Sequence, residues 1–225
     1  MNRLPTIVRQ HLAGLRLLLI FTVICGIIYP LVMVGIGQVL FNHQANGSLV
    51  RYGNRIVGSS LLCQEFVNSK GDPLPQYFQP RPSYAIVNWS LSQYKNGKYY
   101  ISGTGPNNYG CNPLYSSASN LGTNNPAQIQ FVEQRQKQIS AFDRVPISKI
   151  PSDAVTGSGS GLDPDITLAN ASIQVDRVAA ARHISPAQVM ALVRQFTTGR
   201  TLGFLGEPVV NVLLLNTALD EKYPV

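Results

Sequence analysis

The sequence predicts a single N-terminal transmembrane helix followed by one α+β (or α/β) extracytoplasmic domain. Three observations lead to this fold class. Residues 17–40 form an uncharged apolar run, and the only charged residues before position 42 are three arginines. In the remaining sequence, strand patterns come first, helix patterns follow, and an apolar strand pattern comes last, which is typical of one mixed domain.

The composition excludes several classes of protein. Of the 225 residues, 44% are hydrophobic and only 13% are charged, where a soluble globular domain has about a quarter charged. Of the net charge of +7, +3 comes from the first 41 residues, which have no acid, and the other 184 residues carry 15 bases against 11 acids. No later basic cluster is interleaved with aromatic residues, so nucleic acid is not an expected partner. Three cysteines are too few for a disulfide scaffold.

The run LLLIFTVICGIIYPLVMVGIGQVL, residues 17–40, is long enough to cross a bilayer. As a helix it measures roughly 36 Å, against a hydrocarbon core of about 30 Å. The alternative is a cleaved signal peptide, which would leave a secreted binding domain beginning near Ala45. Signal sequences have shorter apolar regions that end at small residues, whereas this run ends at Phe41-Asn42-His43, so we expect a retained anchor in the lipid bilayer.

The arginines predict the orientation of this anchor. Arg3, Arg9 and Arg16 precede the run with no acid to offset them, and only Arg51 and Arg55 follow it closely. Since basic residues near a span stay in the cytoplasm, residues 1–16 are expected inside the cell, 17–40 in the membrane, and 41–225 outside.

Three residues of the span predict a packing surface for other helices. Thr22 and Gly26 form a small-xxx-small pair that would allow a close approach, and Pro30 would kink or loosen the helix. The alternative is that glycine and proline are simply common in membrane spans.

The first part of the domain predicts strands and then a long polar loop. Residues 45–50 are typical of a turn leading into a strand, and 54–63 of a second strand interrupted by a glycine. Residues 83–125 are rich in Asn, Gly, Ser and Tyr, which favours ordered turns over packed elements. Cys63 and Cys111 either form a disulfide that pins this loop or remain two free thiols.

Helix signals follow the loop. Asn125-Pro126 predicts an N-cap and first helical residue, with Ile129, Val132, Ile139 and Phe142 on one face. Asp163-Pro164 predicts a second helix running to Arg182, in which Asp163 and Asp165 lie near the positive end of the dipole. Ser185-Pro186-Ala187-Gln188 predicts a capping box and a third helix with a stop near Gly199. The apolar run 209–216 predicts a final strand.

The residues that could do chemistry do not form a convincing catalytic or metal site. His183 is the only histidine far from the span, so zinc is not expected. The Gly/Ser run 157–161 has glycine where a nucleophile elbow needs serine, and it fits neither a P-loop nor a dinucleotide fingerprint, so a structural loop is expected. Asp176, Arg177 and Arg182 are interpreted as a solvated helix face.

Eight segments in order resemble one protein family. They are YPLVMVGIGQVLF, QANGSLV, GSSLLCQEF, YFQPRPSYA, SNLGTNNP, VPISKIPSDAVTGSGSGLDPDIT, QVDRVAAARHIS and GEPVVNVLLLNTALD. Together they resemble the KdpC family, the C subunits of the bacterial high-affinity potassium-transporting ATPase. The resemblance covers nearly the whole chain, with residues 86–119 longer than the usual family link.

This resemblance implies a function and partners. It implies a single-span, non-hydrolytic accessory subunit in the bacterial inner membrane, which assembles with a channel-like potassium-translocating subunit and a P-type ATPase subunit. The chain itself lacks the DKTGT sequence of a pump. The family is described as a catalytic chaperone that raises the ATP affinity of the pump subunit, which implies that Gln174 faces nucleotide in a ternary complex. The predicted topology argues against that contact, because ATP is cytosolic.

The resulting hypothesis is an accessory subunit without catalytic residues, metal or tightly bound cofactor. Its partner interface is expected to include the acid-free stretch from Pro73 to Phe131, with Arg81, Pro82, Ser83 and Asn120, and also Arg177. The alternative is a membrane-tethered extracytoplasmic serine hydrolase. Its candidate residues are Ser158, Ser160 and His183.

Overall fold

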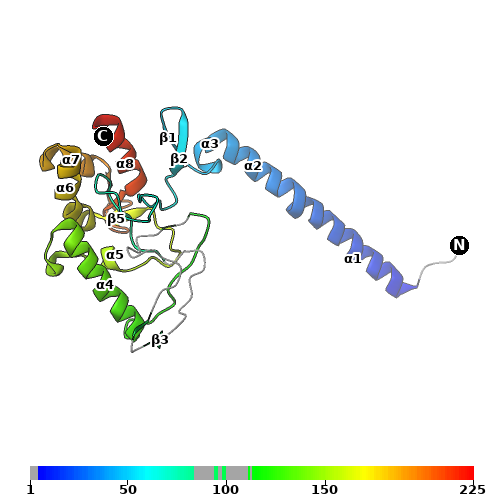
Figure 1. Cartoon of the computed structure of the whole chain (residues 1–225). Helices are drawn as coiled ribbons and strands as arrows, with labels where there is room; N and C mark the ends of the chain where they lie inside the picture. The colour runs from blue at the N-terminus through cyan, green and yellow to red at the C-terminus, as the bar shows by residue number, and fades with distance from the viewer. Residues whose placement is uncertain (1–4, 84–93, 96–97, 100–110, 112) are drawn as a thin grey trace. The chain divides into compact units, whose positions relative to one another are not determined.

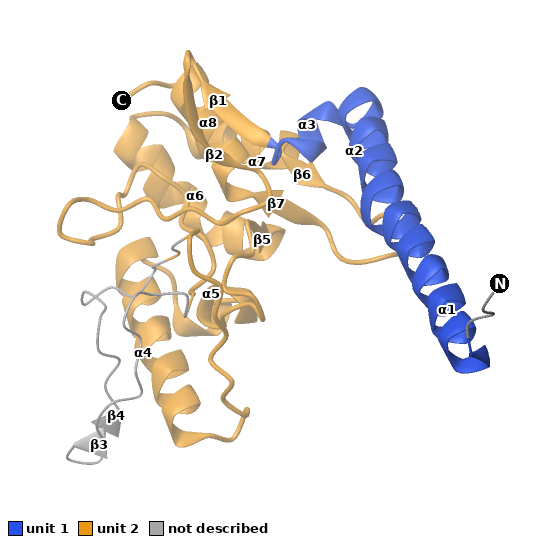
Figure 2. Ribbon diagram, turned by 90° about the vertical axis from the view of Figure 1, so that its right-hand side faces the viewer, with its two compact units in different colours: residues 1–48 blue, residues 49–225 orange. Residues whose placement is uncertain are grey.

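The computed structural model describes residues 5–83, 94–95, 98–99, 111 and 113–225. It divides the chain into two compact units, Met1–Ser48 and Leu49–Val225 (Figure 2). The long polar loop predicted for 83–125, and the extended link 86–119 within it, lie largely outside the described residues. Of their central part only β3 (Tyr94–Lys95) and β4 (Lys98–Tyr99), which pair antiparallel, are placed.

The N-terminal unit is dominated by one long apolar helix (Figure 1). It consists of α1 (Thr6–Val23), a π-helical turn η1 (Ile24–Ile28) and α2 (Tyr29–Leu40). The 35 residues are long and apolar enough to cross a membrane, and none of them is buried within the chain. Because the helix begins at Thr6, two of the arginines that precede the apolar run lie on its first turns.

Pro30 accounts for the π-helical turn. Proline has no N–H to donate to the carbonyl four residues earlier, so the helix widens locally just before it. The N–H of Tyr29 donates to the carbonyl of Ile24, five residues back. A Cβ on Gly26 would lie 4.0 Å from Thr22 Cγ2, so Thr22 and Gly26 are neighbours on one face of this helix.

A polar network ends the membrane helix. Phe41 leaves the helical conformation with φ of −132°, and the short α3 (Asn42–Ala45) follows. Gln38 Oε1 accepts hydrogen bonds from the side-chain amides of Asn42 at 3.0 Å and Asn46 at 3.1 Å. These amides place strongly polar groups at the end of the apolar run, where an emerging span meets water.

The second unit begins with the two predicted strands, β1 (Leu49–Tyr52) and β2 (Arg55–Ser59), and the structure pairs them as an antiparallel hairpin. The second strand ends at Ser59, before the predicted Cys63. A Cβ on Gly58 would come 2.8 Å from Leu213 Cδ2 and 2.5 Å from Gln64 Oε1. The glycine therefore lies close to the Leu213 side chain of the C-terminal helix, and a larger residue would have to displace the ends of the Gln64 and Leu213 side chains.

A small antiparallel sheet lies at the centre of this unit. Its strands are β5 (Asp165–Thr167), β6 (Thr197–Thr198) and β7 (Val209–Asn211), in the order β5-β7-β6. Three helices pack with it: α6 (Leu168–Arg182), α7 (Pro186–Gln195) and α8 (Val212–Lys222). The domain is therefore α+β, with more residues in helices than in strands over the described part of the chain.

Two predicted boundaries are wrong. The helix expected at Asp163-Pro164 begins instead at Leu168, because Thr167 is the N-cap and accepts a hydrogen bond from the N–H of Asn170. The strand expected over 209–216 ends at Asn211, whose side chain accepts from the N–H of Leu214 and so begins α8. In both cases the N-cap side chain, which satisfies an amide with no helical partner, decides where the helix starts.

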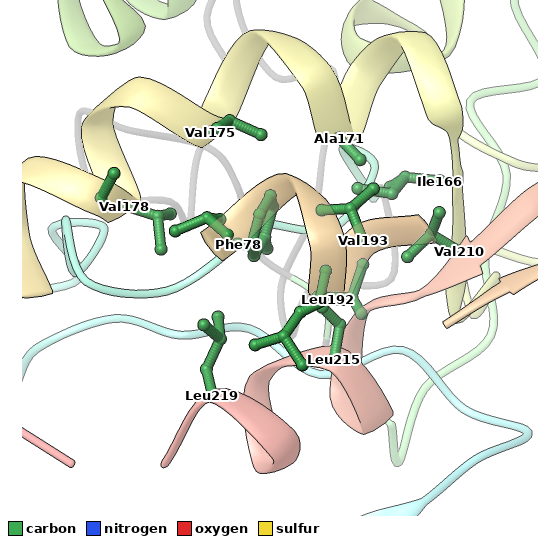
Figure 3. Packing of buried hydrophobic residues seen from close by; sticks show 13 residues of the cluster. Phe78, Ile166, Ala171, Val175, Val178, Leu192, Val193, Val210, Leu215 and Leu219 are labelled. Atoms are coloured by element: carbon green, nitrogen blue, oxygen red, sulfur yellow. The ribbon is translucent and has the colours of Figure 1, made fainter. Parts of the chain in front are cut away.

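The main core lies between the sheet and these three helices (Figure 3). Phe78, Val178, Leu215 and Leu219 are completely buried. The predicted start of α7 at Ser185 is confirmed as a full capping box, and its predicted apolar residues Val189, Leu192 and Val193 are buried, with Phe196 partly so. The helix ends at Gln195, four residues before Gly199.

A second, smaller core lies under α4 (Pro126–Asp143), whose predicted N-cap Asn125 accepts from the N–H of Ala127. Ile139 packs there with residues of α5 (Ser152–Val155), which follows the 3₁₀ turn η2 (Ile147–Lys149). The predicted apolar face is partly wrong, because Ile129 is 46% exposed. The buried residues recur at every fourth position and include an arginine and an aspartate; they are Ala127, Phe131, Arg135, Ile139 and Asp143.

A disulfide and the Gly/Ser run hold the loops together. Cys63 and Cys111 are bonded, with Cα atoms 6.0 Å apart, which resolves the alternative left open by the sequence. Gly161 adopts φ of +70°, and its carbonyl accepts from Ser83 Oγ at 2.6 Å. The carbonyl of Ser160 accepts from the N–H of Ser117. The run 157–161 is therefore an ordered structural loop, as expected.

Candidate functional site

The most elaborate polar site in the described part of the domain surrounds the chain segment Pro75–Gln79. The backbone of this segment is bound by four side chains, Gln174, Arg177 and Arg182 of α6 and Asn216 of α8. We call these four residues the polar clamp. Because Phe78 and Gln79 are buried, their backbone groups need partners inside the protein, and the clamp provides them.

Two amide side chains replace a neighbouring strand. Gln174 accepts from the N–H of Gln79 at 2.7 Å and donates to its carbonyl at 3.2 Å. Asn216 accepts from the N–H of Phe78 and donates to its carbonyl, both at 2.9 Å. Each amide thus satisfies one residue of the segment completely, as a strand would in a sheet.

The two arginines bind carbonyl groups of the same segment. Arg177 Nη1 donates to the carbonyls of Pro75 at 2.7 Å and Tyr77 at 2.8 Å. Arg182 Nε donates to the carbonyl of Gln76 at 2.7 Å. A guanidinium has several donors in a fixed plane, so one arginine can hold several acceptors at once.

Each arginine also pairs with an aspartate. Arg177 Nε lies 2.7 Å from Asp143 Oδ1, and both side chains are buried, at 7% and 5% exposure. Arg182 Nη2 lies 2.7 Å from Asp220 Oδ1. Burial raises the pKa of Asp143, while Arg177 lowers it to a smaller extent. The prediction of a solvated face is therefore wrong for both arginines, whose charges are neutralised inside the domain.

Aromatic rings cover the two guanidinium groups. Arg177 lies over the ring of Phe142 at 4.3 Å and Arg182 over the ring of Tyr77 at 5.0 Å. The hydroxyl of Tyr77 donates to Asp220 Oδ2 at 3.0 Å. Burial raises the pKa of Tyr77, and the Asp220 charge adds to this effect. Ion pairs, hydrogen bonds and cation–π contacts thus all hold Arg177 and Arg182 in position.

Gln174 is engaged in structure rather than open to a ligand. It is 4% exposed, its Oε1 also accepts from Arg177 at 2.8 Å, and its Nε2 also donates to Asn170 at 3.0 Å. A cavity lined partly by Gln79, Asp143 and Gln174 measures only about 10 Å³, which is room for about one water. Small-molecule sites need several hundred Å³, so the described residues around Gln174 do not fit a nucleotide.

The predicted interface residues occupy different environments. Arg81 pairs with Asp163 at 2.7 Å and remains partly exposed, while Pro82 and Ser83 are buried. Asn120 is exposed and adopts φ of +54°, and Arg177 belongs to the clamp. Their contact with a partner stays a prediction.

The serine hydrolase alternative gains no support from the geometry. Ser158 Oγ accepts from the N–H of Gly161, and Ser160 Oγ from the N–H of Leu162. His183 is an exposed C-cap of α6 with φ of +56°. Over the described ranges no hydrogen bond joins His183 to either serine, and no group of three or more His, Cys, Asp or Glu is placed to hold a metal.

Sequence reasoning singled out three of the four clamp residues but missed Asn216 and the structural role that the four share. Asn216 lay inside an expected strand, and Asp143 and Asp220 are 34 and 38 residues from their arginines. The only available signal was two arginines on a helix whose sequence is otherwise largely apolar or small. Such residues are rarely buried unless they are paired.

The sequence matches a known family over both units. The model of the KdpC family, described as the c chain of the K⁺-transporting ATPase, matches residues 11–221. This chain belongs to the KdpC family. The match extends from the membrane helix through the polar clamp to α8, and it confirms the resemblance inferred from the eight ordered segments.

Several relatives carry the name potassium-transporting ATPase KdpC subunit. The protein of Mycobacterium tuberculosis is 43% identical over 213 residues, covering 94% of this chain and 98% of the relative. That of Sorangium cellulosum is 45% identical over 207 residues, covering 92% and 95%. That of Streptomyces avermitilis is 39% identical over 231 residues, covering 98% and 97%. These relatives therefore match nearly the whole length of this chain.

Proposed function

We propose that this chain is a non-hydrolytic accessory subunit of a bacterial ATP-driven potassium uptake complex. In this role it assembles with, and stabilises, a channel-like potassium-translocating subunit and a P-type ATPase subunit. Membership of the KdpC family supports the complex, and one structural observation supports the mode of assembly. The helix Thr6–Leu40 buries none of its side chains within its own chain, so its whole surface is available to lipid and to partner helices.

Helix packing in the membrane would use the face that contains Thr22 and Gly26. Gly26 and Thr22 are neighbours on the helix surface. Thr22 Oγ1 donates to the carbonyl of Leu18 at 2.8 Å, so the hydroxyl hydrogen is already bonded within the helix. Small residues let two helix backbones approach closely in lipid. The π-helical turn before Pro30 adds a local change of helix shape that a partner helix can match.

Two features support a cytoplasmic N-terminus and a domain outside the inner membrane. The arginines before the apolar run favour the cytoplasmic side. The domain also contains the Cys63–Cys111 disulfide, and disulfides persist in extracytoplasmic compartments but rarely in the cytosol.

The domain's role in this proposal is binding and assembly. The polar groups of the clamp are used to hold the segment Pro75–Gln79 to α6 and α8, rather than being left to react with a substrate. Contact of Gln174 with ATP in a ternary complex remains a prediction from the family description. Photoreactive ATP added to the intact complex should label the pump subunit and not this chain; labelling of this chain that is lost in Gln174→Ala would establish the nucleotide contact.

Purification of the complex tests the proposal. An affinity tag on the P-type ATPase subunit should recover this chain in mild detergent, and Gly26→Leu should reduce the recovery because it fills the packing face. Gly35→Leu, at another glycine of the same helix with open space around it, is the matched control. Recovery of the wild-type chain only as a lone monomer would refute the proposal.

A further inference from the structure

One buried oxygen atom next to the polar clamp has no hydrogen bond from the protein. Gln79 is only 3% exposed, and within the described part of the chain its Oε1 has no partner. The orientation of this amide is fixed, because Nε2 of the same side chain donates to the carbonyls of Phe66 at 2.9 Å and Leu74 at 3.2 Å. Since a buried polar atom is normally hydrogen-bonded, Gln79 Oε1 needs a donor.

Gln79 also lines a small cavity at the boundary between the clamp and the smaller core. The cavity measures about 10 Å³, which is close to the least volume that holds one water molecule. Ile139 and Ala154 of the smaller core contribute to its wall, and so does Gln174 of the clamp. Residues of α4, α5 and α6 thus surround the space beside Gln79.

We propose that this cavity is a binding site for one structural water molecule, which donates one hydrogen bond to Gln79 Oε1 and another to the carboxylate of Asp143. Asp143 also lines the cavity. A carboxylate has about four acceptor positions, and Arg177 Nε occupies one of those of Asp143. Buried waters generally make two to four hydrogen bonds to polar groups of the protein. In this position the water joins the segment Pro75–Gln79 to α4.

The groups around the cavity favour water over an ion. Gln79 Oε1 and the Asp143 carboxylate are both acceptors, so the ligand must be a donor, and an anion would be repelled. A cation would lie near the guanidinium of Arg177, which already neutralises Asp143 at 2.7 Å. A neutral molecule that donates two hydrogen bonds meets neither repulsion, and the size of the cavity restricts it to water.

A high-resolution crystal structure of the full chain tests the site. If the crystals are grown with rubidium as the only monovalent cation, a bound cation gives an anomalous signal and a water does not. We expect one peak with the scattering of oxygen, about 2.5–3.0 Å from Gln79 Oε1 and from an oxygen of Asp143. A rubidium signal in the cavity, no peak, or a peak beyond hydrogen-bond reach of Gln79 Oε1 would each overturn the proposal.

Substitution of the buried Ala154 tests the position of the water. Ala154→Val adds two methyl groups at the wall of the cavity, so the peak should be lost and the melting temperature lowered, because a methyl group cannot replace the hydrogen bonds of the water. Ala141→Val, at an exposed alanine of α4, is the matched control and should retain the peak.

Ala154→Ser is the second variant, for use if valine prevents folding. Its hydroxyl takes the place of the water as the donor to Gln79 Oε1, so the peak should again be lost while the melting temperature stays closer to that of the wild type. An unchanged peak in whichever of these variants folds would contradict the proposal. The result does not depend on the proposed subunit role, since it concerns the domain alone.

Discussion

At the scale of single residues, the polar clamp shows how side chains can replace secondary structure. Gln174 and Asn216 each satisfy both backbone groups of one buried residue, which a sheet would otherwise have done. An unsatisfied buried N–H or C=O costs roughly 1–3 kcal/mol. The polarity of α6 is therefore explained by the segment it binds.

Removal of the Gln174 amide should destabilise the domain without removing a ligand. Gln174→Ala leaves the N–H and C=O of Gln79 without partners, and we expect a loss of about 2 kcal/mol in the free energy of unfolding. Asn216→Ala should have a similar effect, because it leaves the N–H and C=O of Phe78 without partners. Chemical denaturation of the purified chain measures both, with the exposed Gln195→Ala as control. A change below about 0.5 kcal/mol for Gln174→Ala would contradict this role.

Buried carboxyl groups predict how stability depends on pH. Burial raises the pKa of Asp165 above its ordinary 3.8; Asn211 opposes this effect and Asp163 adds to it. Burial likewise raises the pKa of Asp143. The folded state then holds these protons more tightly than the unfolded chain, so their contribution to stability falls as pH rises from the ordinary value through the raised one.

Asp165→Asn tests this sign. The variant retains the oxygen that accepts from Asn211 but cannot ionise, so the fall in melting temperature with rising pH above about 4 should be smaller than in the wild type. Asp176→Asn, at an exposed acid, is the control and should leave the dependence of the melting temperature on pH unchanged. A steeper fall in Asp165→Asn would contradict the direction of the pKa shift.

At the scale of elements, local signals predicted helices well only where the capping residues were unambiguous. The starts at Asn125 and Ser185 were predicted because each is followed by proline and a helical apolar pattern. Asp163-Pro164 has the same appearance, yet the Asp163 carboxylate is bound to Arg81, 82 residues away. Asp163 also accepts from the N–H of Asp165 in a local turn, and the chain continues as β5 before Thr167 caps α6.

The prediction of a strand over residues 209–216 was wrong for another reason. Eight mostly apolar residues without clear periodicity fit a buried strand or a buried helix equally well. Asn211 decides between them by capping α8. The fold class, the membrane helix and the first two strands could be predicted from the sequence, whereas the clamp could not, because its ion pairs join distant segments.

Asn211→Ala should weaken the start of α8. Its side chain accepts from the N–H of Leu214 and donates to the carbonyl of Ser60 at 2.9 Å. Loss of an N-cap costs about 1 kcal/mol, and the lost contact to Ser60 adds to it. Thermal unfolding should show the decrease, and Asn211→Ser, which supplies a capping oxygen without a second carboxylate beside Asp165, should recover part of it. Equal losses in the two variants would contradict a capping role.

At the scale of the whole molecule, an apolar helix and a disulfide-linked domain are joined in one chain. The disulfide encloses 48 positions of sequence, and a loop of that length stabilises a fold by about 4 kcal/mol in the chain-entropy model. The double variant Cys63→Ser/Cys111→Ser should therefore unfold at a much lower temperature, while Cys25→Ser, at an exposed cysteine in the span, should not. Equal melting temperatures for the double variant and the wild type would contradict a stabilising disulfide.

The orientation of the domain is the claim on which the account depends most, because partner docking and the use of a disulfide both require it to lie outside the cytoplasm. It is tested by placing a cysteine at the exposed Glu221 of α8 and treating intact cells with a membrane-impermeant thiol reagent. We expect Glu221→Cys to be labelled in intact cells. Labelling that occurs only after the inner membrane is permeabilised would contradict the account.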